Sequence, residues 1–312
     1  MKVYSGFEAL NDIKNPVLTI GTFDGVHVGH QKIIEKLNQI ATQVDGESVL
    51  FTFFPHPRMI INPLNHGIKL IQSQAEKLEK LEKLGLKHLI IVPFTKEFSE
   101  ITAYDFVVEL LVKKLKINTL IVGYDHQFGK NREGDLTYLV DKGKVFDFNV
   151  IEIPAQEIND VNVSSSKIRH ALEDGNISVA NHYLNESFQL WGKVIHGNKL
   201  GRTIGFPTAN IEINDPLKLI PGNGVYGVSL RLEDKRMVYG MMNIGIRPTI
   251  DDMKSVHIEI HIFDFNEEIY GQNIRIFIHH FIRKEQKFES IDVLKNQLKE
   301  DEKITRTTLL VS

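Results

Sequence analysis

Short apolar runs alternate with segments of helical spacing throughout residues 1–185, and this alternation constrains the fold more than any other feature of the chain. Runs rich in β-branched and aromatic residues occur at 17–23, 48–54, 88–94, 119–124 and 145–153. Leu78, Leu81 and Leu84 lie on one helical stripe between two of these runs, and Thr102 is placed to cap a further helix. Near-continuous apolar strands separated by helices predict a doubly wound α/β domain around a parallel sheet. Its ligands are expected at the carboxyl ends of the strands.

The helical segments disappear in the second part of the chain. Strand-like runs at 188–195, 226–232, 236–244, 255–263 and 273–282 follow one another with Gly and Pro between them. This pattern predicts a small antiparallel β-barrel, closed by a terminal helix over 289–305. We therefore expect two domains, 1–185 and 186–312.

The composition narrows the classes of partner. Lys and Arg number 37 against 40 Asp and Glu, so the formal charge is only -3, which argues against binding to nucleic acid. The chain contains no cysteine, which excludes disulfides, thiolate zinc sites and a cysteine nucleophile. Its apolar runs are too short to span a bilayer, and no signal peptide is apparent. We expect a cytoplasmic protein without membrane contact, as a monomer or a weak oligomer.

Two histidines lie three residues apart in the stretch GTFDGVHVGH, where the first strand gives way to a helix. The spacing of His27 and His30 differs from the i, i+4 pair of zinc proteases, and no glutamate accompanies them, which argues against a metal pair. A structural role in the core would not explain the three glycines of the stretch. A helix N-terminus presents free N–H groups and partial positive charge, so a phosphate site is the best physical interpretation.

This stretch resembles the G-x-F-D-x-x-H-x-G-H signature of the nucleotidyltransferase superfamily, which has a Rossmann-like fold, transfers AMP or CMP and releases pyrophosphate. The resemblance implies that His27 and His30 contact the triphosphate and stabilise the leaving pyrophosphate. The ATP-binding positions that it implies here are Gly21, Phe23, Asp24, His27, Gly29 and His30.

A second stretch, VSSSKIRHAL over 163–172, resembles the I-S-S-T/S-x-I-R element of the same superfamily. The resemblance implies that Ser165, Ser166 and the catalytic Arg169 hold the ATP phosphates, a contact that suits the forked guanidinium. Without that resemblance, the same residues would be a helix cap and a surface arginine.

Two loops at predicted strand ends, FTFFPHPR and VGYDHQFGKNREGD, resemble those of the prokaryotic bifunctional riboflavin kinase/FAD synthetase family. In that family the loops receive FMN, which implies flavin contacts at Pro55, His56, Asp125 and Phe128. The sequence departs from the family pattern at Thr22, Tyr124 and His126. Taken alone, each stretch would be a polar loop.

The stretch GKVIHGNKLGRTIGFPTANI opens the second domain. Its GNKLGRT segment fails as a Walker A loop, because the glycines are too close, Arg replaces Lys and no helix pattern follows. GFPTAN instead resembles the signature of the riboflavin kinase fold, which implies that Thr208 and Asn210 hold Mg²⁺ on ATP. The implied ATP and metal site of the kinase comprises Gly201, Arg202, Gly205, Pro207, Thr208 and Asn210.

Glu259 lies on the polar side of the strand SVHIEIHIF, where it alternates with isoleucines. By itself this alternation describes a solvent-facing stripe. The family resemblance makes Glu259 the general base that deprotonates the 5′-hydroxyl of riboflavin. The kinase flavin site that it implies comprises Tyr226, Asn243, Arg247 and Glu259.

The resemblance therefore implies an enzyme with two activities. One phosphorylates riboflavin with ATP and Mg²⁺ to give FMN, and the other adenylylates FMN with ATP to give FAD and pyrophosphate. Two alternatives remain open: a single nucleotidyltransferase acting on another phosphorylated acceptor, and a non-enzymatic flavin-binding regulator.

Overall fold

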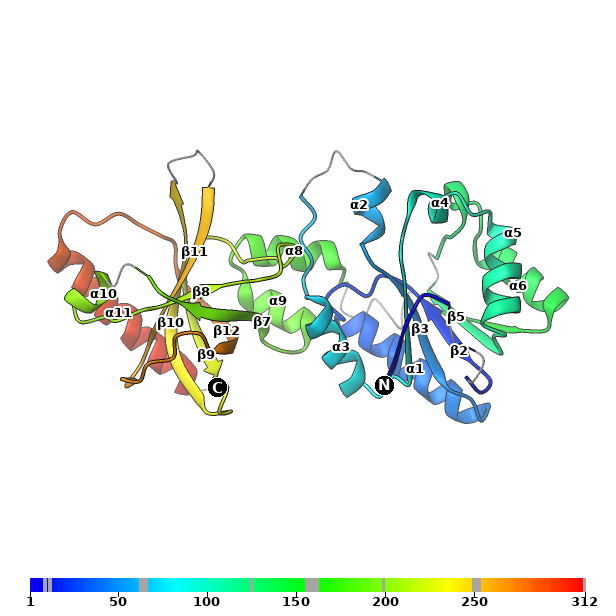
Figure 1. Cartoon of the computed structure of the whole chain (residues 1–312), viewed down its shortest axis with the longest axis horizontal. Coiled ribbons are helices and arrows are strands. Elements are labelled where there is room, and N and C mark those ends of the chain that lie inside the picture. Colours follow the sequence, from blue (N-terminus) through cyan, green and yellow to red (C-terminus); the bar gives the residue numbers. More distant parts are fainter. Residues whose placement is uncertain are drawn as a thin grey trace. The chain divides into compact units, whose positions relative to one another are not determined.

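The computed structural model describes residues 1–7, 10, 13–61, 67–123, 126–154, 163–197, 200–248 and 254–310. Two compact units make up the chain, Met1–Ser164 and Ser165–Ser312 (Figure 1). They divide earlier in the sequence than the predicted boundary at 185/186, because helix α9 (Ile177–Leu184) packs against strands of the second unit. Where the functional domains divide stays a prediction.

A six-stranded sheet forms the centre of the first unit. Its strands are β1 (Lys2–Ser5), β2 (Val17–Ile20), β3 (Ser48–Phe53), β4 (His88–Val92), β5 (Thr119–Gly123) and β6 (Asn149–Ile153). The helices are α1 (Val28–Gln43), α2 (Pro57–Ile61), α3 (Gln74–Lys83), α4 (Lys96–Ser99), α5 (Ala103–Asp105), the π-helix η2 (Phe106–Lys114), the 3₁₀-helix η3 (Lys130–Arg132) and α6 (Leu136–Phe146).

The strand order is β1-β4-β3-β2-β5-β6, and every neighbouring pair is parallel. The chain first moves from β2 to β3 and β4, and then returns to the other side of β2 with β5 and β6. The predicted doubly wound fold is confirmed. Because the order reverses beside β2, the carboxyl end of this strand is the place where such sheets bind ligands.

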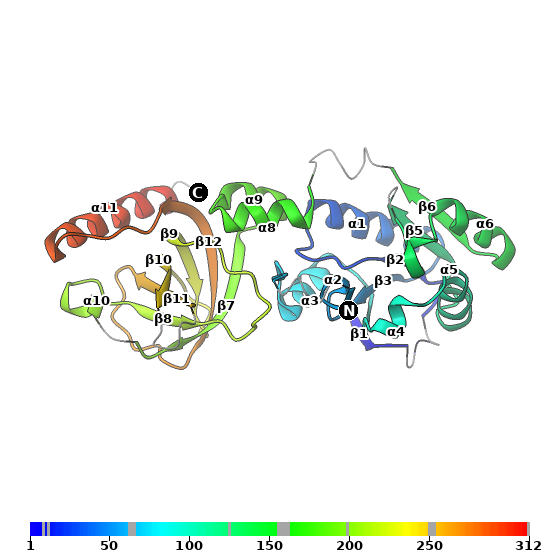
Figure 2. The ribbon, with the colours of Figure 1, turned by 90° about the horizontal axis from the view of Figure 1, so that it is seen from above.

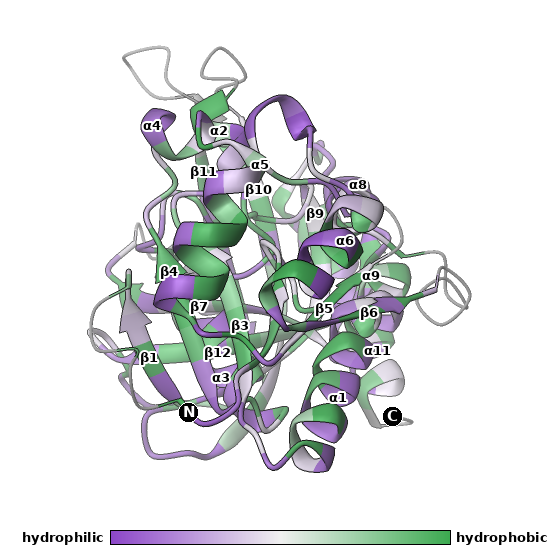
Figure 3. Cartoon of the chain, turned by 90° about the vertical axis from the view of Figure 1, so that its right-hand side faces the viewer, coloured by the Kyte–Doolittle hydropathy of each residue, from purple (hydrophilic) through white to green (hydrophobic). Residues whose placement is uncertain are grey.

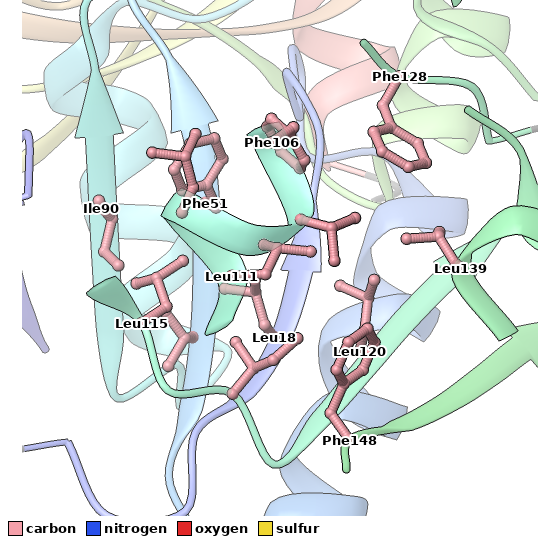
Figure 4. Packing of buried hydrophobic residues seen from close by; sticks show 14 of the residues in the cluster. Leu18, Phe51, Ile90, Phe106, Leu111, Leu115, Leu120, Phe128, Leu139 and Phe148 are labelled. Carbon is pink, nitrogen blue, oxygen red and sulfur yellow. The ribbon is translucent and has the colours of Figure 1, made fainter. Parts of the chain in front are cut away.

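Apolar clusters cover both faces of the sheet. One cluster places residues of η2, such as Phe106 and Leu111, against Leu18 and Phe51 of the strands (Figure 4). The other places α1 and α3 on the opposite face, with Leu37 among its buried residues. Figure 3 shows how apolar and polar residues alternate along α1, as expected of a helix with one buried face. This burial fixes the N-terminus of α1 near the carboxyl ends of the strands.

One local prediction needs correction. The strand predicted over 145–153 begins only at Asn149, because Phe146 still belongs to α6 and Asp147 ends that helix in the left-handed conformation. The edge strand β1 was not predicted, since its residues are mostly exposed and carry no apolar alternation. The predicted cap is confirmed: the Thr102 hydroxyl accepts a hydrogen bond from the backbone N–H of Asp105.

The second unit is built around a closed barrel. Its strands are β7 (Phe188–Ile195), β8 (Ala209–Glu212), β9 (Gly224–Arg231), β10 (Met237–Pro248), β11 (Lys254–Ile262) and β12 (Asn273–Arg283). Its helices are α8 (Ser165–Glu173), α9, α10 (Leu200–Thr203) and α11 (Ile291–Leu310). All neighbouring strands are antiparallel, in the order β10-β11-β8-β7-β12-β9, so the predicted barrel with a terminal helix is confirmed.

Helix α11 runs along the outside of the barrel (Figure 2). Asp301 on its buried side is fully enclosed and accepts hydrogen bonds from Nε of Arg283 on β12, at 2.9 and 3.0 Å. Inside the barrel, Ile258 and Ile260 of β11 are buried while Glu259 between them faces outward. Nowhere in the described part of the chain is a helix long and apolar enough to cross a membrane.

Candidate active sites

The loop between β2 and α1 lies at the switch point of the parallel sheet and carries the predicted histidines. Its backbone is unusual, because Phe23 and Val26 adopt left-handed φ angles of 48° and 39°. A positive φ is rare for any residue with a side chain and most costly for a β-branched one such as valine. Gly25 has a φ of 86°, and a Cβ there would lie 3.1 Å from Ile71. The surrounding structure must therefore hold this loop in place.

Polar contacts of Asp24, Gln31 and Lys77 help to hold it. The buried Asp24 carboxylate accepts from the backbone N–H of Ile71 at 3.0 Å. The side-chain amide of Gln31 donates to the carbonyl of Val26 at 2.9 Å. Nζ of Lys77, on α3, donates to the carbonyl of Thr22 at 2.6 Å. The observed contacts of Asp24 thus brace the loop, and its predicted role in ATP binding stays a prediction.

The structure brings the two predicted histidines into direct contact. His27 is the N-cap of α1, and its Nδ1 accepts from the backbone N–H of His30 at 3.4 Å. The two rings stack with centroids 3.7 Å apart, and the Phe23 ring stacks on His30 at 4.4 Å. Because Nδ1 of His27 accepts a hydrogen bond, the proton of its neutral ring belongs on Nε2, which can donate to an oxyanion. Nδ1 of His30 is buried and has no hydrogen-bond partner among the residues that the structure describes.

Both histidines are uncharged near neutral pH. Burial, with a contribution from Lys80, lowers the pKa of His27 to about 4. Burial, followed by His27, Lys77 and Lys80, lowers the pKa of His30 well below its ordinary value. The positive potential at this helix N-terminus therefore comes from two lysines of α3 and from the helix itself, and a bound triphosphate would favour protonation of the histidines.

Of the predicted flavin-loop residues, two follow a strand end, one is buried in the core and one lies outside the described residues. Pro55 and His56 follow β3, and Nδ1 of His56 accepts from the backbone N–H of Arg58 at 3.2 Å. Phe128 is 8% exposed and packs against Phe106 in the core of the first unit. Asp125 and its neighbour Tyr124 lie outside the described residues. The flavin contacts of these positions stay predictions.

Ser165, Ser166 and Arg169 all lie on α8, which belongs to the second compact unit. Arg169 is buried, at 9% exposure, whereas Ser166 is exposed. Their joint phosphate site with His27 and His30 stays a prediction.

In the barrel, three predicted kinase residues lie side by side on neighbouring strands. Asn243 of β10 is directly opposite Glu259 of β11, which is directly opposite Asn210 of β8. Residues directly opposite in an antiparallel pair project from the same face of the sheet. The hydroxyl of Thr208 donates to Oε2 of Glu259 at 3.5 Å. The structure therefore gathers the predicted metal ligands and the predicted base on one outer patch of the barrel.

Glycines bring backbone close to this patch. A Cβ on Gly197 would lie 2.0 Å from the side-chain nitrogen of Asn210, and one on Gly245 would lie 2.5 Å from Glu285. A cavity beside the patch is lined by Arg202, Pro207 and Thr208, together with apolar residues of β11. A Cβ on Gly201 would collide with the carbonyl oxygen of Phe206, and Gly205 has a φ of 86°.

One predicted flavin residue of the kinase, Tyr226, does not lie on this patch. Tyr226 is opposite Met242 on the inner face of the barrel, is fully buried, and donates its hydroxyl proton to the carbonyl of Gly222. Burial raises the pKa of this phenol to about 12. Arg247 lies near the end of β10, and its side chain is outside the described residues.

The donor set on the barrel suits Mg²⁺. Thr208 and Asn210 offer a hydroxyl and an amide oxygen beside the Glu259 carboxylate, and magnesium prefers oxygen ligands and fills its remaining positions with water and phosphate. Among the residues that the structure describes, no group of three or more His, Asp or Glu side chains is arranged to hold a metal by itself. A metal here would therefore be shared with a phosphate-bearing substrate.

The sequence patterns do not reveal Lys77 or Thr52, whose side chains both donate to the Thr22 carbonyl in the loop between β2 and α1. Lys77 belongs to a regular Lys/Glu-rich helix, so it does not differ locally from a surface residue. Thr52 occupies the carboxyl end of β3, and that position at a strand end was the only available signal.

The chain resembles known proteins over nearly its whole length. Residues 10–167 match the family model described as FAD synthetase, and residues 184–309 match the one described as riboflavin kinase. A bifunctional riboflavin kinase/FMN adenylyltransferase of Listeria monocytogenes is 39% identical over 94% of this chain and 92% of the relative. Its namesake in Escherichia coli is 35% identical over 98% and 97% of the two chains.

A solved structure from Streptococcus pneumoniae, described as a macrolide-efflux protein, is also similar. It is 32% identical to this chain, with a TM-score of 0.88, and the match covers 98% of this chain and 99% of that one. Similarity in sequence and in fold thus extends over both units.

Proposed function

The chain belongs to the family of bifunctional riboflavin kinase/FMN adenylyltransferases, and from this premise we propose which of its residues carry each of the two reactions. The chain phosphorylates riboflavin to FMN and adenylylates FMN to FAD. The match of two family models, in order along one chain, carries this conclusion. The efflux description of the pneumococcal structure names another activity, whereas both models and the curated relatives name flavin enzymes.

We assign adenylyl transfer to the loop between β2 and α1. A phosphate oxygen of FMN attacks the α-phosphorus of ATP, the bond from that phosphorus to the bridging oxygen breaks, and pyrophosphate leaves. The attacking phosphate is already ionised, so this step needs no general base. Nε2–H of His27, His30 and the free N–H groups at the start of α1 are available to stabilise the leaving pyrophosphate. Arg169 and the serines of α8 stay proposed partners in this site.

We assign phosphoryl transfer to the outer patch of the barrel. Glu259 accepts the proton of the riboflavin 5′-hydroxyl as that oxygen attacks the γ-phosphorus of ATP, and ADP leaves. Such general-base assistance contributes about 10²–10⁴-fold. Thr208 and Asn210 would hold Mg²⁺, which supplies positive charge against the phosphoryl oxygens when it is bound with ATP. We propose that Asn243, directly opposite Glu259 on the neighbouring strand, orients the same hydroxyl.

ATP, riboflavin and FMN are the small-molecule partners that this function requires, and Mg²⁺ is the proposed cofactor. We further propose that the enzyme works in the cytoplasm, since both reactions consume ATP. The absence of a nucleic-acid partner and a monomeric or weakly oligomeric state stay predictions.

The test is product analysis after the full chain is incubated with riboflavin, ATP and Mg²⁺. FMN that appears first and is followed by FAD is the expected result. A single product would support a one-activity enzyme. Bound but unchanged riboflavin, together with unchanged FMN in a second incubation, would support the regulator.

A further inference from the structure

Lys77 is a buried lysine at the edge of the proposed adenylylation site. It lies on α3 and is only 5% exposed. Nζ donates to the carbonyl of Thr22 at 2.6 Å and to the hydroxyl of Thr52 at 2.9 Å. The Thr52 hydroxyl in turn donates to the same Thr22 carbonyl at 3.2 Å. These three groups form a closed polar triangle that joins α3, the end of β3 and the loop after β2.

A buried ammonium is costly unless nearby groups compensate it. Burial lowers the pKa of Lys77 to about 8, and the charge of Asp24 acts in the opposite direction. Neither contact partner of its Nζ is ionised, so the two hydrogen bonds compensate the buried charge only in part. A methionine or leucine would fill the same space without that cost, so stability alone does not explain a lysine here.

The position of the triangle suggests its role. Thr22 immediately precedes Phe23, which has a left-handed φ of 48° and stacks on the ring of His30. A strained loop keeps one conformation only where neighbouring groups fix it. The charge of Lys77 also acts on His30, whose pKa it helps to lower. Lys77 therefore affects both the geometry and the protonation of the histidine pair.

We propose that Lys77 is a positioning residue for adenylyl transfer, which fixes the Thr22 carbonyl and so holds the 21–27 loop with His27 and His30 directed at the triphosphate. This inference rests on the proposed function of the loop. Thr52 is a second positioning residue, because its hydroxyl accepts a hydrogen bond from Nζ of Lys77 and donates one to the carbonyl of Thr22. Neither residue touches the reacting atoms in this account.

The test compares K77M with the wild-type enzyme, because methionine matches the length of the lysine stem and suits a buried site. FAD formation from FMN and ATP should fall by about 10²-fold, mainly in kcat, as expected for a misplaced catalytic loop. FMN formation from riboflavin by the same preparation should be unchanged. T52V should lower FAD formation by less, since it removes the hydrogen bonds of the Thr52 hydroxyl but leaves the Lys77 ammonium bonded to the Thr22 carbonyl. K83M is the matched control, because Lys83 lies on the same helix and its side chain is 69% exposed.

A second readout separates this role from simple support of the fold. In histidine-labelled protein followed by NMR, K77M should raise the pKa of His30, whereas K83M should not. FAD formation by K77M close to that of wild type would overturn the proposal. Loss of activity without any change in the His30 pKa would also overturn it, since that result describes a purely structural lysine. If H30A still makes FAD normally, the proposed function of the loop itself fails, and the inference fails with it.

Discussion

At the scale of single residues, His27 couples the folding of the first unit to pH. Its Nδ1 caps α1 only while that nitrogen is unprotonated, and burial lowers the pKa from 6.5 to about 4. Between these two values the unfolded chain binds a proton that the folded chain does not. The free energy of unfolding should therefore fall as the pH drops from 6.5, by about 3 kcal/mol at pH 4.

H27N tests this coupling, because asparagine also caps helices but does not titrate in this range. Urea unfolding is followed by circular dichroism near pH 7 and near pH 5. Between these pH values, the free energy of unfolding should fall more for the wild-type chain than for H27N. Equal losses in the two proteins would show that His27 is not the group responsible.

Any side chain added at Gly197 would disturb the site on the barrel directly. A Cβ there would lie 2.0 Å from the side-chain nitrogen of Asn210, so G197A must displace this amide. We expect FMN formation to fall roughly 10- to 100-fold, with a higher requirement for Mg²⁺, while FAD formation from supplied FMN stays normal. Mg²⁺ titrations of both activities measure this difference, and normal Mg²⁺ dependence of the kinase would contradict the role of Asn210.

At the scale of elements, one buried ion pair joins α11 to the barrel. Asp301 is enclosed against β12, where it accepts from Arg283, while Gln297 donates to it from one turn earlier in α11. Removing one charge of a buried pair leaves the other uncompensated, which costs about 3–5 kcal/mol. D301N should destabilise the barrel by that amount.

The single tryptophan, Trp191, lies on β7, so its fluorescence reports unfolding of the second unit. Urea unfolding of D301N followed by this fluorescence measures the loss in the free energy of unfolding of the barrel. D264N is the control, since Asp264 pairs with Arg306 on the surface, where such a pair contributes about 1 kcal/mol or less. Equal losses in the two variants would mean that burial of Asp301 is not what matters.

The sequence predicted elements better than it predicted contacts between them. Alternation in β11 put Glu259 on the polar side, and the structure agrees, because apolar period and burial are both local consequences of the pleat. The same reasoning could not place Tyr226, whose inner position follows from its pairing with Met242 on another strand. Lys77 was missed for a similar reason: its burial comes from packing of α3 on the sheet, which no local pattern encodes.

At the scale of the whole molecule, two architectures supply two different kinds of catalysis. The parallel sheet offers a helix N-terminus and neutral histidines, which suit a reaction limited by charge on a leaving group. The barrel offers a carboxylate between two amides, which suits deprotonation of a hydroxyl and binding of a metal–nucleotide complex. Each activity should therefore be separable from the other by mutation.

The most direct test is a crossed assay of H30A and E259Q, each supplied separately with riboflavin or with FMN, in the presence of ATP and Mg²⁺. H30A should convert riboflavin to FMN at a normal rate and make no FAD from either substrate. E259Q should make FAD from FMN normally, while its conversion of riboflavin falls by about 10²–10⁴-fold. If either variant loses both activities while remaining folded, the two-site account is wrong.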